Sequence, residues 1–334
     1  MAKVKSKWVC QNCGYESAGY LGKCPECGAW TSFVEEVQNN LKPQNISPQG
    51  ITNDTKPSLI NDIHIGEEVR VSTNISEFDR ILGGGLVQGS LVLIAGDPGI
   101  GKSTILLQTS GELCNNGQKI LYVSAEESAS QLKLRANRLG INSDKLYIYP
   151  QTNLESIRQQ ISELQPDTIV IDSIQAIYSQ TISSSAGSVS QIRECCNILM
   201  QIAKTQNITV IVIGHVTKDG NIAGPKILEH MVDTVISFEG DKYKSYRMLR
   251  SMKNRFGNTS EVGIFEMQAK GLVEVKNPNE LFLNERSQDA IPGSAIIVTN
   301  EGTRPLLVEI QALVGTTPYP TPRRVTNGVD NSRL

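Results

Sequence analysis

Residues 91–104 read LVLIAGDPGIGKST, an apolar run that leads into a glycine-rich loop ending in Lys102 and Ser103. The loop matches G-x-x-x-x-G-K-[ST] directly after a strand-like run and before a segment of helical length. Its glycines let the backbone fold around a phosphate with the amides inward, and the following helix presents its positive end to the anion. We therefore expect Lys102 to reach the β- and γ-phosphates of ATP. The residues assigned to the nucleotide are Gly96, Asp97, Pro98, Gly99, Ile100, Gly101, Lys102, Ser103 and Thr104.

Further apolar runs surround this loop in the sequence. Continuous runs separated by segments of helical length indicate a mainly parallel sheet that is buried on both faces. Beyond residue 230 the runs follow one another too closely for helices, so we expect the sheet to end in antiparallel hairpins. The sequence thus predicts an α/β domain over residues 69–276. Its parallel part is predicted from the runs 90–96, 119–125, 145–150, 167–173 and 208–215.

Acidic side chains follow two of these runs, where the carboxyl ends of parallel strands meet. Asp172 ends the fourth run, and we expect it to bind Mg²⁺ together with Ser103; the alternative is an ordinary strand-end cap. Glu126 and Glu127 follow the second run, and a nucleotide hydrolase needs a carboxylate to orient or deprotonate water. We assign this base to Glu126. The alternative is that both glutamates are helix-start charges favoured by the helix dipole.

His215 ends the fifth run, at the same predicted edge of the sheet. A histidine there can sense the γ-phosphate or transmit its loss to the loop that follows, so we count it among the catalytic candidates. The alternative is a structural histidine whose ring nitrogens are satisfied within the fold.

Four cysteines near the N-terminus form two C-x₂-C pairs that are ten residues apart. Four thiolates at this spacing suit tetrahedral Zn²⁺, and a complete sulfur shell indicates a structural site. Disulfides are the alternative, which a reducing compartment disfavours. We expect Trp8, Trp30 and Phe33 to pack a small core around the metal. The predicted zinc ligands are Cys10, Cys13, Cys24 and Cys27.

Composition limits the partners and the location of the chain. The formal net charge is -2 and the pI is near 6.0, so any DNA contact has to come from local patches. No stretch reaches the roughly 18 apolar residues of a membrane span, and the first residues lack the apolar core of a signal peptide. We expect a cytoplasmic protein without membrane contact.

The chain divides into four predicted segments. Residues 1–36 form the zinc module, and residues 37–68 form a linker rich in Asn, Gln, Pro and Ser. The α/β domain comes next. Residues 277–334 begin with two apolar runs across a Glu-Gly turn, which predicts one hairpin. The residues after this hairpin are too few to close a separate core, so this last domain is expected to be truncated.

The stretch KNRFG at residues 253–257 places two cations around an amide near the end of a predicted strand. Lys253 and Arg255 alternate with Asn254, so both point to one face. One interpretation is an exposed basic strand end. The other is that Lys253 and Arg255 act in trans as catalytic cationic fingers, stabilising charge on the departing γ-phosphate of a neighbouring subunit.

These motifs, in this order, resemble the RadA (Sms) family of bacterial DNA repair proteins. The resemblance covers essentially the whole chain and implies a C4 zinc module, a RecA-like ATPase core and the start of a Lon-protease-like α+β domain, here without peptidase activity. The motifs that carry it are CQNCG and CPECG, GDPGIGKST, DSIQAIYS, GSVSQIREC, GHVTKDGNIAGPKILEHMVDT and KNRFG.

The resemblance also implies a homohexamer that encircles single-stranded DNA and drives branch migration of branched DNA in homologous recombination. DNA would lie along residues 179–190, whose SSSAGS is too polar to pack, and along residues 216–226, where Lys218 and Lys226 face phosphates. Each of these loops has the alternative of a surface loop without a ligand. The recombinase RecA or replication proteins are candidate partners of the zinc module.

A competing interpretation comes from residues 72–104, STNISEFDRILGGGLVQGSLVLIAGDPGIGKST, which resemble the KaiC group of RecA-like ATPases. That likeness implies a regulatory ATPase without DNA translocation, and the zinc module and KNRFG argue against it. A third class is a scaffold that uses ATP only to assemble.

Overall fold

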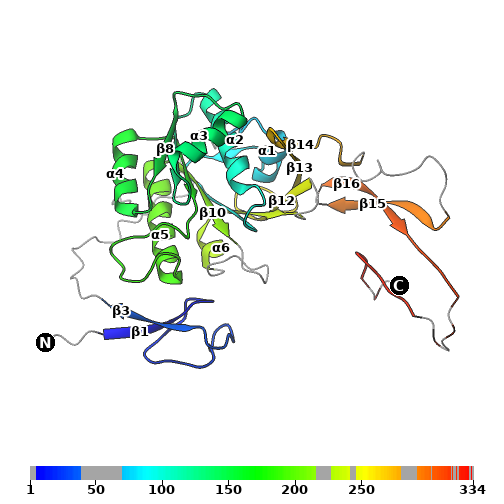
Figure 1. Cartoon of the computed structure of the whole chain (residues 1–334), viewed down its shortest axis with the longest axis horizontal. Coiled ribbons are helices and arrows are strands. Elements are labelled where there is room, and N and C mark those ends of the chain that lie inside the picture. Colours follow the sequence, from blue (N-terminus) through cyan, green and yellow to red (C-terminus); the bar gives the residue numbers. More distant parts are fainter. Residues whose placement is uncertain are drawn as a thin grey trace, which may run out of the picture. The chain divides into compact units, whose positions relative to one another are not determined.

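A computed structural model describes residues 5–38, 70–215, 227–240, 246–279, 292–301, 303–316, 318, 321, 323–330 and 332. The chain forms two compact units, one running to Lys276 together with Glu301–Arg304, and the other made by the rest of the C-terminal segment (Figure 1). None of the helices in the described part of the chain combines the length and the apolar character that a bilayer crossing needs.

The α/β part of the first unit is built on a nine-stranded sheet with the order β14-β13-β12-β11-β6-β10-β9-β7-β8. Its parallel strands are β6 (Leu91–Gly96), β7 (Ile120–Ser124), β8 (Leu146–Pro150), β9 (Thr168–Asp172), β10 (Thr209–His215) and β11 (Thr234–Glu239). The antiparallel strands are β12 (Tyr246–Asn254), β13 (Val262–Gln268) and β14 (Gly271–Glu274). The predicted mainly parallel sheet, ending in antiparallel hairpins, is confirmed.

Helices cover both faces of this sheet (Figure 1). Side chains of β6 alternate between two cores, as the period of two in a strand requires. Val92 and Ile94 pack with α1, α2 and α3, whereas Leu91 and Leu93 pack with α4, α5 and α6. The helices are α1 (Ser76–Leu82), α2 (Lys102–Asn115), α3 (Ala129–Arg138), α4 (Leu154–Leu164), α5 (Val189–Gln206) and α6 (Ile227–Met231).

The last residues of the parallel strands lie side by side at the carboxyl edge of the sheet. The last residues of β6 and β10, Gly96 and His215, are in register. Asp172 ends β9 in register with Ser124, the last residue of β7. The ends of four neighbouring strands therefore converge on the start of α2.

The segment after β12 leaves the sheet at the opposite edge. Asn254 pairs with Thr234 at the start of β11, and Thr234 is in register with Val92 near the start of β6. Four residue steps of about 3.3 Å separate Val92 from Gly96, so KNRFG lies about 13 Å along the strand from the phosphate-binding loop of the same chain.

The N-terminal module is a three-stranded antiparallel sheet in which Phe33 is buried with Cys10 and Cys24, and Trp8 packs against them. Trp30 is 69% exposed, and the ammonium of Lys23 lies 5.5 Å from its ring centroid. The expectation that Trp30 belongs to this core is therefore wrong, because its ring lies mostly in solvent beside the ammonium of Lys23. The strands are β1 (Lys5–Cys10), β2 (Glu16–Ser17) and β3 (Phe33–Gln38).

Two further pairs of strands complete the described structure. Before the phosphate-binding loop, β4 (Arg70–Val71) pairs with β5 (Leu86–Val87). In the C-terminal segment, β15 (Ser294–Glu301) and β16 (Arg304–Gln311) form the two-stranded sheet that the apolar runs predict.

Candidate functional site

The glycine-rich loop joins β6 to α2, and its lysine lies folded over it. Nζ of Lys102 donates hydrogen bonds to the carbonyl oxygens of Gly96 at 2.7 Å and Asp97 at 2.8 Å. Gly101, the N-cap of α2, has a φ of 122°, a conformation that glycine adopts without strain. Burial lowers the pKa of Lys102 to about 8, although nearby carboxylates oppose the shift. An ammonium in this position can exchange the two carbonyls for phosphate oxygens.

Asp172 lies beside the first turn of α2 and is 7% exposed. The hydroxyl of Tyr122 donates to Oδ2 of Asp172 at 2.8 Å. Burial raises the pKa of Asp172, while hydrogen bonds from Ser103 and Tyr122 act in the opposite direction. Ser103 and Asp172 thus bring together a hydroxyl and a carboxylate, and such oxygen donors suit Mg²⁺. The sequence did not predict the hydrogen bond from Tyr122 to Asp172, because Tyr122 lies inside an apolar run.

Glu126 lies between two polar residues from neighbouring strand ends. Oγ of Ser173 donates to Oε1 of Glu126 at 2.5 Å, and Nε2 of His215 lies 3.1 Å from the same oxygen. Because a carboxylate only accepts, we assign the donated proton to Nε2 of the histidine. Burial would raise the pKa of Glu126, but the bonds from Ser173 and His215 outweigh it and lower the pKa. The group is therefore held ionised, as a base requires.

Glu127, the other candidate base, forms its hydrogen bonds with Arg135 and Ser124. Its Oε1 accepts from Nη2 of Arg135 at 2.6 Å, and its backbone N–H donates to Oγ of Ser124. Glu127 therefore belongs to the start of α3, where negative charge is favoured. Of the two glutamates, Glu126 is the one that contacts Ser173, directly after β9, and His215, the last residue of β10.

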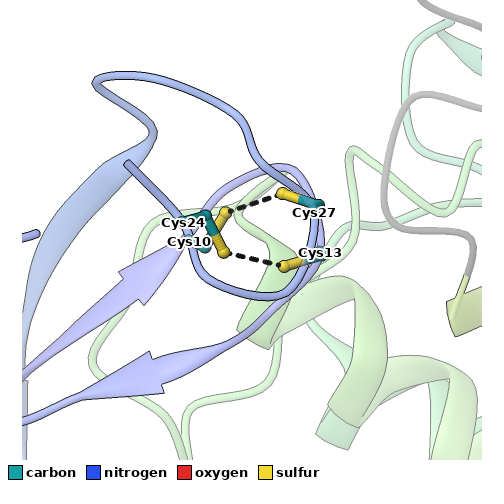
Figure 2. A group of neighbouring side chains, drawn as sticks. All are labelled: Cys10, Cys13, Cys24 and Cys27. Atoms are coloured by element: carbon teal, nitrogen blue, oxygen red, sulfur yellow. Dashed lines mark hydrogen bonds between the residues drawn. The ribbon is translucent and has the colours of Figure 1, made fainter. Parts of the chain in front are cut away.

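The four N-terminal cysteines converge on one point (Figure 2), with their sulfur atoms within 4.8 Å of one another. The Sγ atoms of Cys10 and Cys27 are 3.8 Å apart, and those of Cys13 and Cys24 are 3.5 Å apart. Both distances far exceed a disulfide bond. A tetrahedral Zn²⁺ with bonds of about 2.3 Å places its sulfurs about 3.8 Å apart. The four thiols thus fit structural zinc.

Lys253 of KNRFG binds the end of α6. Its Nζ lies 2.7 Å from the carbonyl oxygen of Glu229, 3.3 Å from that of His230 and 2.8 Å from that of Val232. Burial and the neighbouring charge of Arg255 lower the pKa of Lys253. Lys253 therefore also stabilises the helix that directly follows residues 216–226.

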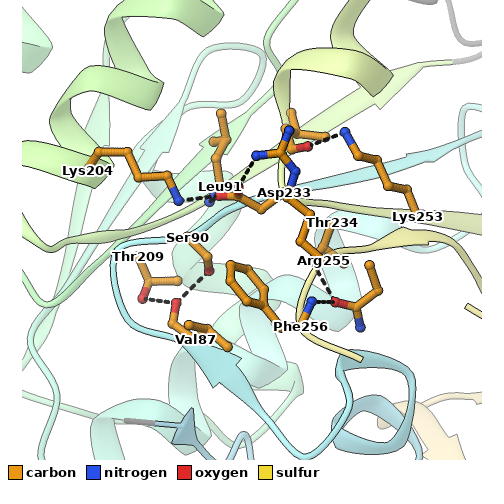
Figure 3. A network of polar contacts seen from close by, with 12 residues as sticks. Val87, Ser90, Leu91, Lys204, Thr209, Asp233, Thr234, Lys253, Arg255 and Phe256 are labelled. Atoms are coloured by element: carbon orange, nitrogen blue, oxygen red, sulfur yellow. Dashed lines mark hydrogen bonds and ion pairs between the residues drawn. The ribbon is translucent and has the colours of Figure 1, made fainter. Parts of the chain in front are cut away.

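Arg255 is the more exposed of the two cations. Its side chain is 56% exposed, and its Nη1 lies 3.5 Å from Oδ1 of Asp233 (Figure 3). Asn254 anchors the turn, because its Nδ2 donates to the carbonyl oxygens of Ile81 and Leu82 and its Oδ1 accepts from the backbone N–H of Phe256. Asp233 lies within the motif GHVTKDGNIAGPKILEHMVDT, but nothing in that stretch of sequence assigns it a contact with Arg255.

The two predicted DNA loops differ in what the structure describes. Residues 216–226, with Lys218 and Lys226, lie outside the described residues. In the stretch 179–190, the side chain of Gln191 donates to the carbonyl oxygens of Ser179, Ile182 and Ser184. A buried amide from α5 thus organises the backbone at residues 179–184, whereas Ser185, Ala186 and Gly187 of SSSAGS are exposed, as its polar composition predicts.

Comparisons with known proteins agree with this arrangement. A family profile described as an AAA domain matches residues 67–221, and one described as a rubredoxin metal binding domain matches residues 8–35. DNA repair protein RadA of Bacillus subtilis is 53% identical over 336 residues, covering 100% of this chain and 73% of that protein. The protein of the same name from Listeria monocytogenes is 52% identical over 339 residues, with the same two coverages.

Among solved structures, a KaiC-like protein of Pyrococcus horikoshii matches with a TM-score of 0.52 and 23% identity, covering 62% of this chain and 99% of that one. This likeness concerns the fold alone. It supports a RecA-like and KaiC-like arrangement of the central sheet.

Proposed function

The chain belongs to the family of DNA repair protein RadA, and from that premise we propose a DNA-dependent ATPase that translocates on single-stranded DNA and drives branch migration of recombination intermediates. The observation that carries the proposal is the contact between His215 and Glu126, 3.1 Å from Nε2 to Oε1. His215 is the last residue before 216–226, a candidate DNA loop. One side chain thus joins the hydrolytic base to a segment that can respond to DNA.

Hydrolysis requires that the nucleotide be held and that water be activated. Lys102 and the amides at the start of α2 would hold the phosphates, and Ser103 with Asp172 would hold Mg²⁺, which when bound neutralises charge on the phosphates. Glu126 would accept the proton of the attacking water. The lowered pKa of Glu126 favours this role, because the base is ionised at neutral pH.

Lys253 and Arg255 would act on the nucleotide of a neighbouring subunit. Two features support this: KNRFG lies at the sheet edge opposite the loop of its own chain, and the side chain of Arg255 is 56% exposed. A cation supplied in trans stabilises charge on the leaving phosphoryl group. Because Lys253 also binds the end of α6, we assign the larger share of this role to Arg255.

The assembly that we propose is a homohexamer around single-stranded DNA. Each subunit would then supply its phosphate-binding loop to one interface and its KNRFG to the next. The zinc module would remain available for the recombinase RecA or for replication proteins. Residues 277–334 would begin a Lon-protease-like α+β domain.

A matched pair of variants tests the proposal. Glu126→Gln should lower the kcat of DNA-stimulated ATP hydrolysis by about 10²- to 10⁴-fold with nucleotide binding intact. Glu127→Gln, which loses a charge at the neighbouring position, should stay within a few-fold of the parent because Glu127 pairs with Arg135. DNA stimulation should weaken as salt rises. Full function of the Glu126→Gln protein would instead indicate a scaffold that needs ATP only to assemble.

A regulatory ATPase of the KaiC type is not favoured. The likeness to the KaiC-like protein covers 62% of the chain at 23% identity, whereas the RadA relatives match all of it at 51–53%. A rate of ATP hydrolysis that single-stranded DNA leaves unchanged at every salt concentration would reverse this preference.

A further inference from the structure

A buried carboxylate connects KNRFG to the start of the strand that carries the phosphate-binding loop (Figure 3). The side chain of Asp233, directly before β11, is 2% exposed. Its Oδ2 accepts from the backbone N–H of Leu91 at 3.0 Å and from Nζ of Lys204 at 2.7 Å. Its Oδ1 faces Nη1 of Arg255 at 3.5 Å.

The backbone of Asp233 makes the same two connections. Its N–H donates to the carbonyl oxygen of Leu91 at 3.0 Å, and its carbonyl oxygen accepts from the N–H of Arg255 at 3.1 Å. The Cα of Arg255 is thereby fixed relative to β6 and β11, and only the side chain beyond it remains to be oriented.

The two oxygens of the carboxylate are used unequally. Oδ2 makes two hydrogen bonds of ordinary length, whereas the contact from Oδ1 to Arg255 is long for a charge-assisted hydrogen bond. Lys204 supplies the close counter-charge that a buried carboxylate needs. Within the described residues, the guanidinium of Arg255 has no other ion-pair partner. Arg255 is thus oriented by a charge that does not hold it tightly.

We propose that Asp233 is a positioning residue for Arg255, aiming its guanidinium toward the neighbouring subunit and accepting it again after phosphate release. Lys204 keeps the attraction weak by sharing the carboxylate. A planar guanidinium can exchange a carboxylate oxygen for phosphate oxygens because both groups are anionic and its N–H fork can bind either of them. This inference rests on the proposed role of Arg255 in trans.

Asp233→Asn tests the idea, because asparagine keeps the size and an oxygen for Leu91 but removes the charge that faces Arg255. We expect kcat of DNA-stimulated hydrolysis to fall between about 10- and 100-fold with KM for ATP unchanged, as for a misplaced catalytic group. In the Arg255→Ala background the same substitution should cause no further loss of kcat.

Mixing experiments distinguish a positioning role from a structural one, since Asp233 touches both Arg255 and β6. Asp233→Asn protein should regain activity when mixed with Lys102→Ala protein, which keeps Arg255 intact, and should gain none with Arg255→Ala protein. The reverse pattern, recovery with Arg255→Ala only, would show that the damage lies in the phosphate-binding loop and would overturn the inference. Wild-type kcat for Asp233→Asn would overturn it as well.

Two controls keep the outcomes separable. If Arg255→Ala protein keeps wild-type kcat, the proposed action of Arg255 in trans is contradicted, and this result does not depend on Asp233. If Asp233→Asn folds poorly, the pair Asp233→Asn with Lys204→Met removes the uncompensated lysine charge. The same complementation pattern is expected for that pair, and thermal melts report whether its fold is intact.

Discussion

Raising the pH should weaken nucleotide binding through Lys102. Burial lowers the pKa of this lysine to about 8 in the free protein, and contact with phosphate oxygens raises the pKa in the bound state. Below pH 8 the lysine is charged in both states, so binding is at full strength. Above pH 8 the free protein has to take up a proton in order to bind, so the affinity falls as pH rises through the pKa of the free state.

The titration of Lys102 sets the size of this effect. With a pKa of about 8, the neutral fraction of Lys102 in the free protein is about a tenth at pH 7 and about nine tenths at pH 9. The Kd for a non-hydrolysable ATP analogue should therefore rise about tenfold between these values, which corresponds to about 1.4 kcal/mol. Binding should take up close to one proton at pH 9 and almost none at pH 7.

Fluorescence titration with a labelled analogue measures the Kd, and calorimetry in two buffers of different ionisation enthalpy measures the proton uptake. Lys102→Arg is the matched control, since arginine stays protonated over this range. A ratio of Kd values between pH 9 and pH 7 that is the same for the parent and for Lys102→Arg would refute the reasoning. So would an absence of proton uptake at pH 9.

Three further predictions concern other parts of the chain. Ser173→Ala removes a hydrogen bond that lowers the pKa of Glu126, so the acidic limb of the pH profile of kcat should move to higher pH; an unmoved limb would separate Ser173 from the base. Removing zinc with a chelator, or replacing Cys13 by Ser, should unfold the N-terminal module as seen by NMR; one zinc per chain is expected before treatment, and an unchanged spectrum would contradict a structural metal. Asn254→Ala should lower the free energy of unfolding by about 1–3 kcal/mol in denaturant titrations, because it leaves the carbonyls of α1 without a donor; an unchanged midpoint would show that the turn does not depend on this amide.

Much of the architecture could be predicted because residues close together in the sequence determine it. Continuous apolar runs next to segments of helical length specify a buried parallel sheet, and the strands β6 to β10 lie within the predicted runs. The glycine-rich loop is equally local, because its spacing specifies the turn into α2. Trp30, which lies between β2 and β3, could not be placed in this way, since whether an aromatic ring enters a small core depends on the tertiary placement of the segment that carries it.

The contacts that join distant segments could not be predicted. Ser173 was readable as a strand-end residue next to Asp172, but its bond to Glu126 spans 47 positions and depends on β7 and β9 being neighbours. Asp233 reaches Leu91 across 142 positions. A pattern of residue types carries no information on such pairings until the strand order is known.

Mixing two inactive proteins shows whether one subunit completes the site of the next on single-stranded DNA. Lys102→Ala and Arg255→Ala proteins should each hydrolyse ATP near background. In an equal mixture, interfaces in which an intact loop meets an intact Arg255 form by chance in about a quarter of cases. The ATPase activity of the mixture should therefore approach about a quarter of the parent rate. Activity that stays at the background of the two proteins alone, at every mixing ratio, would contradict it.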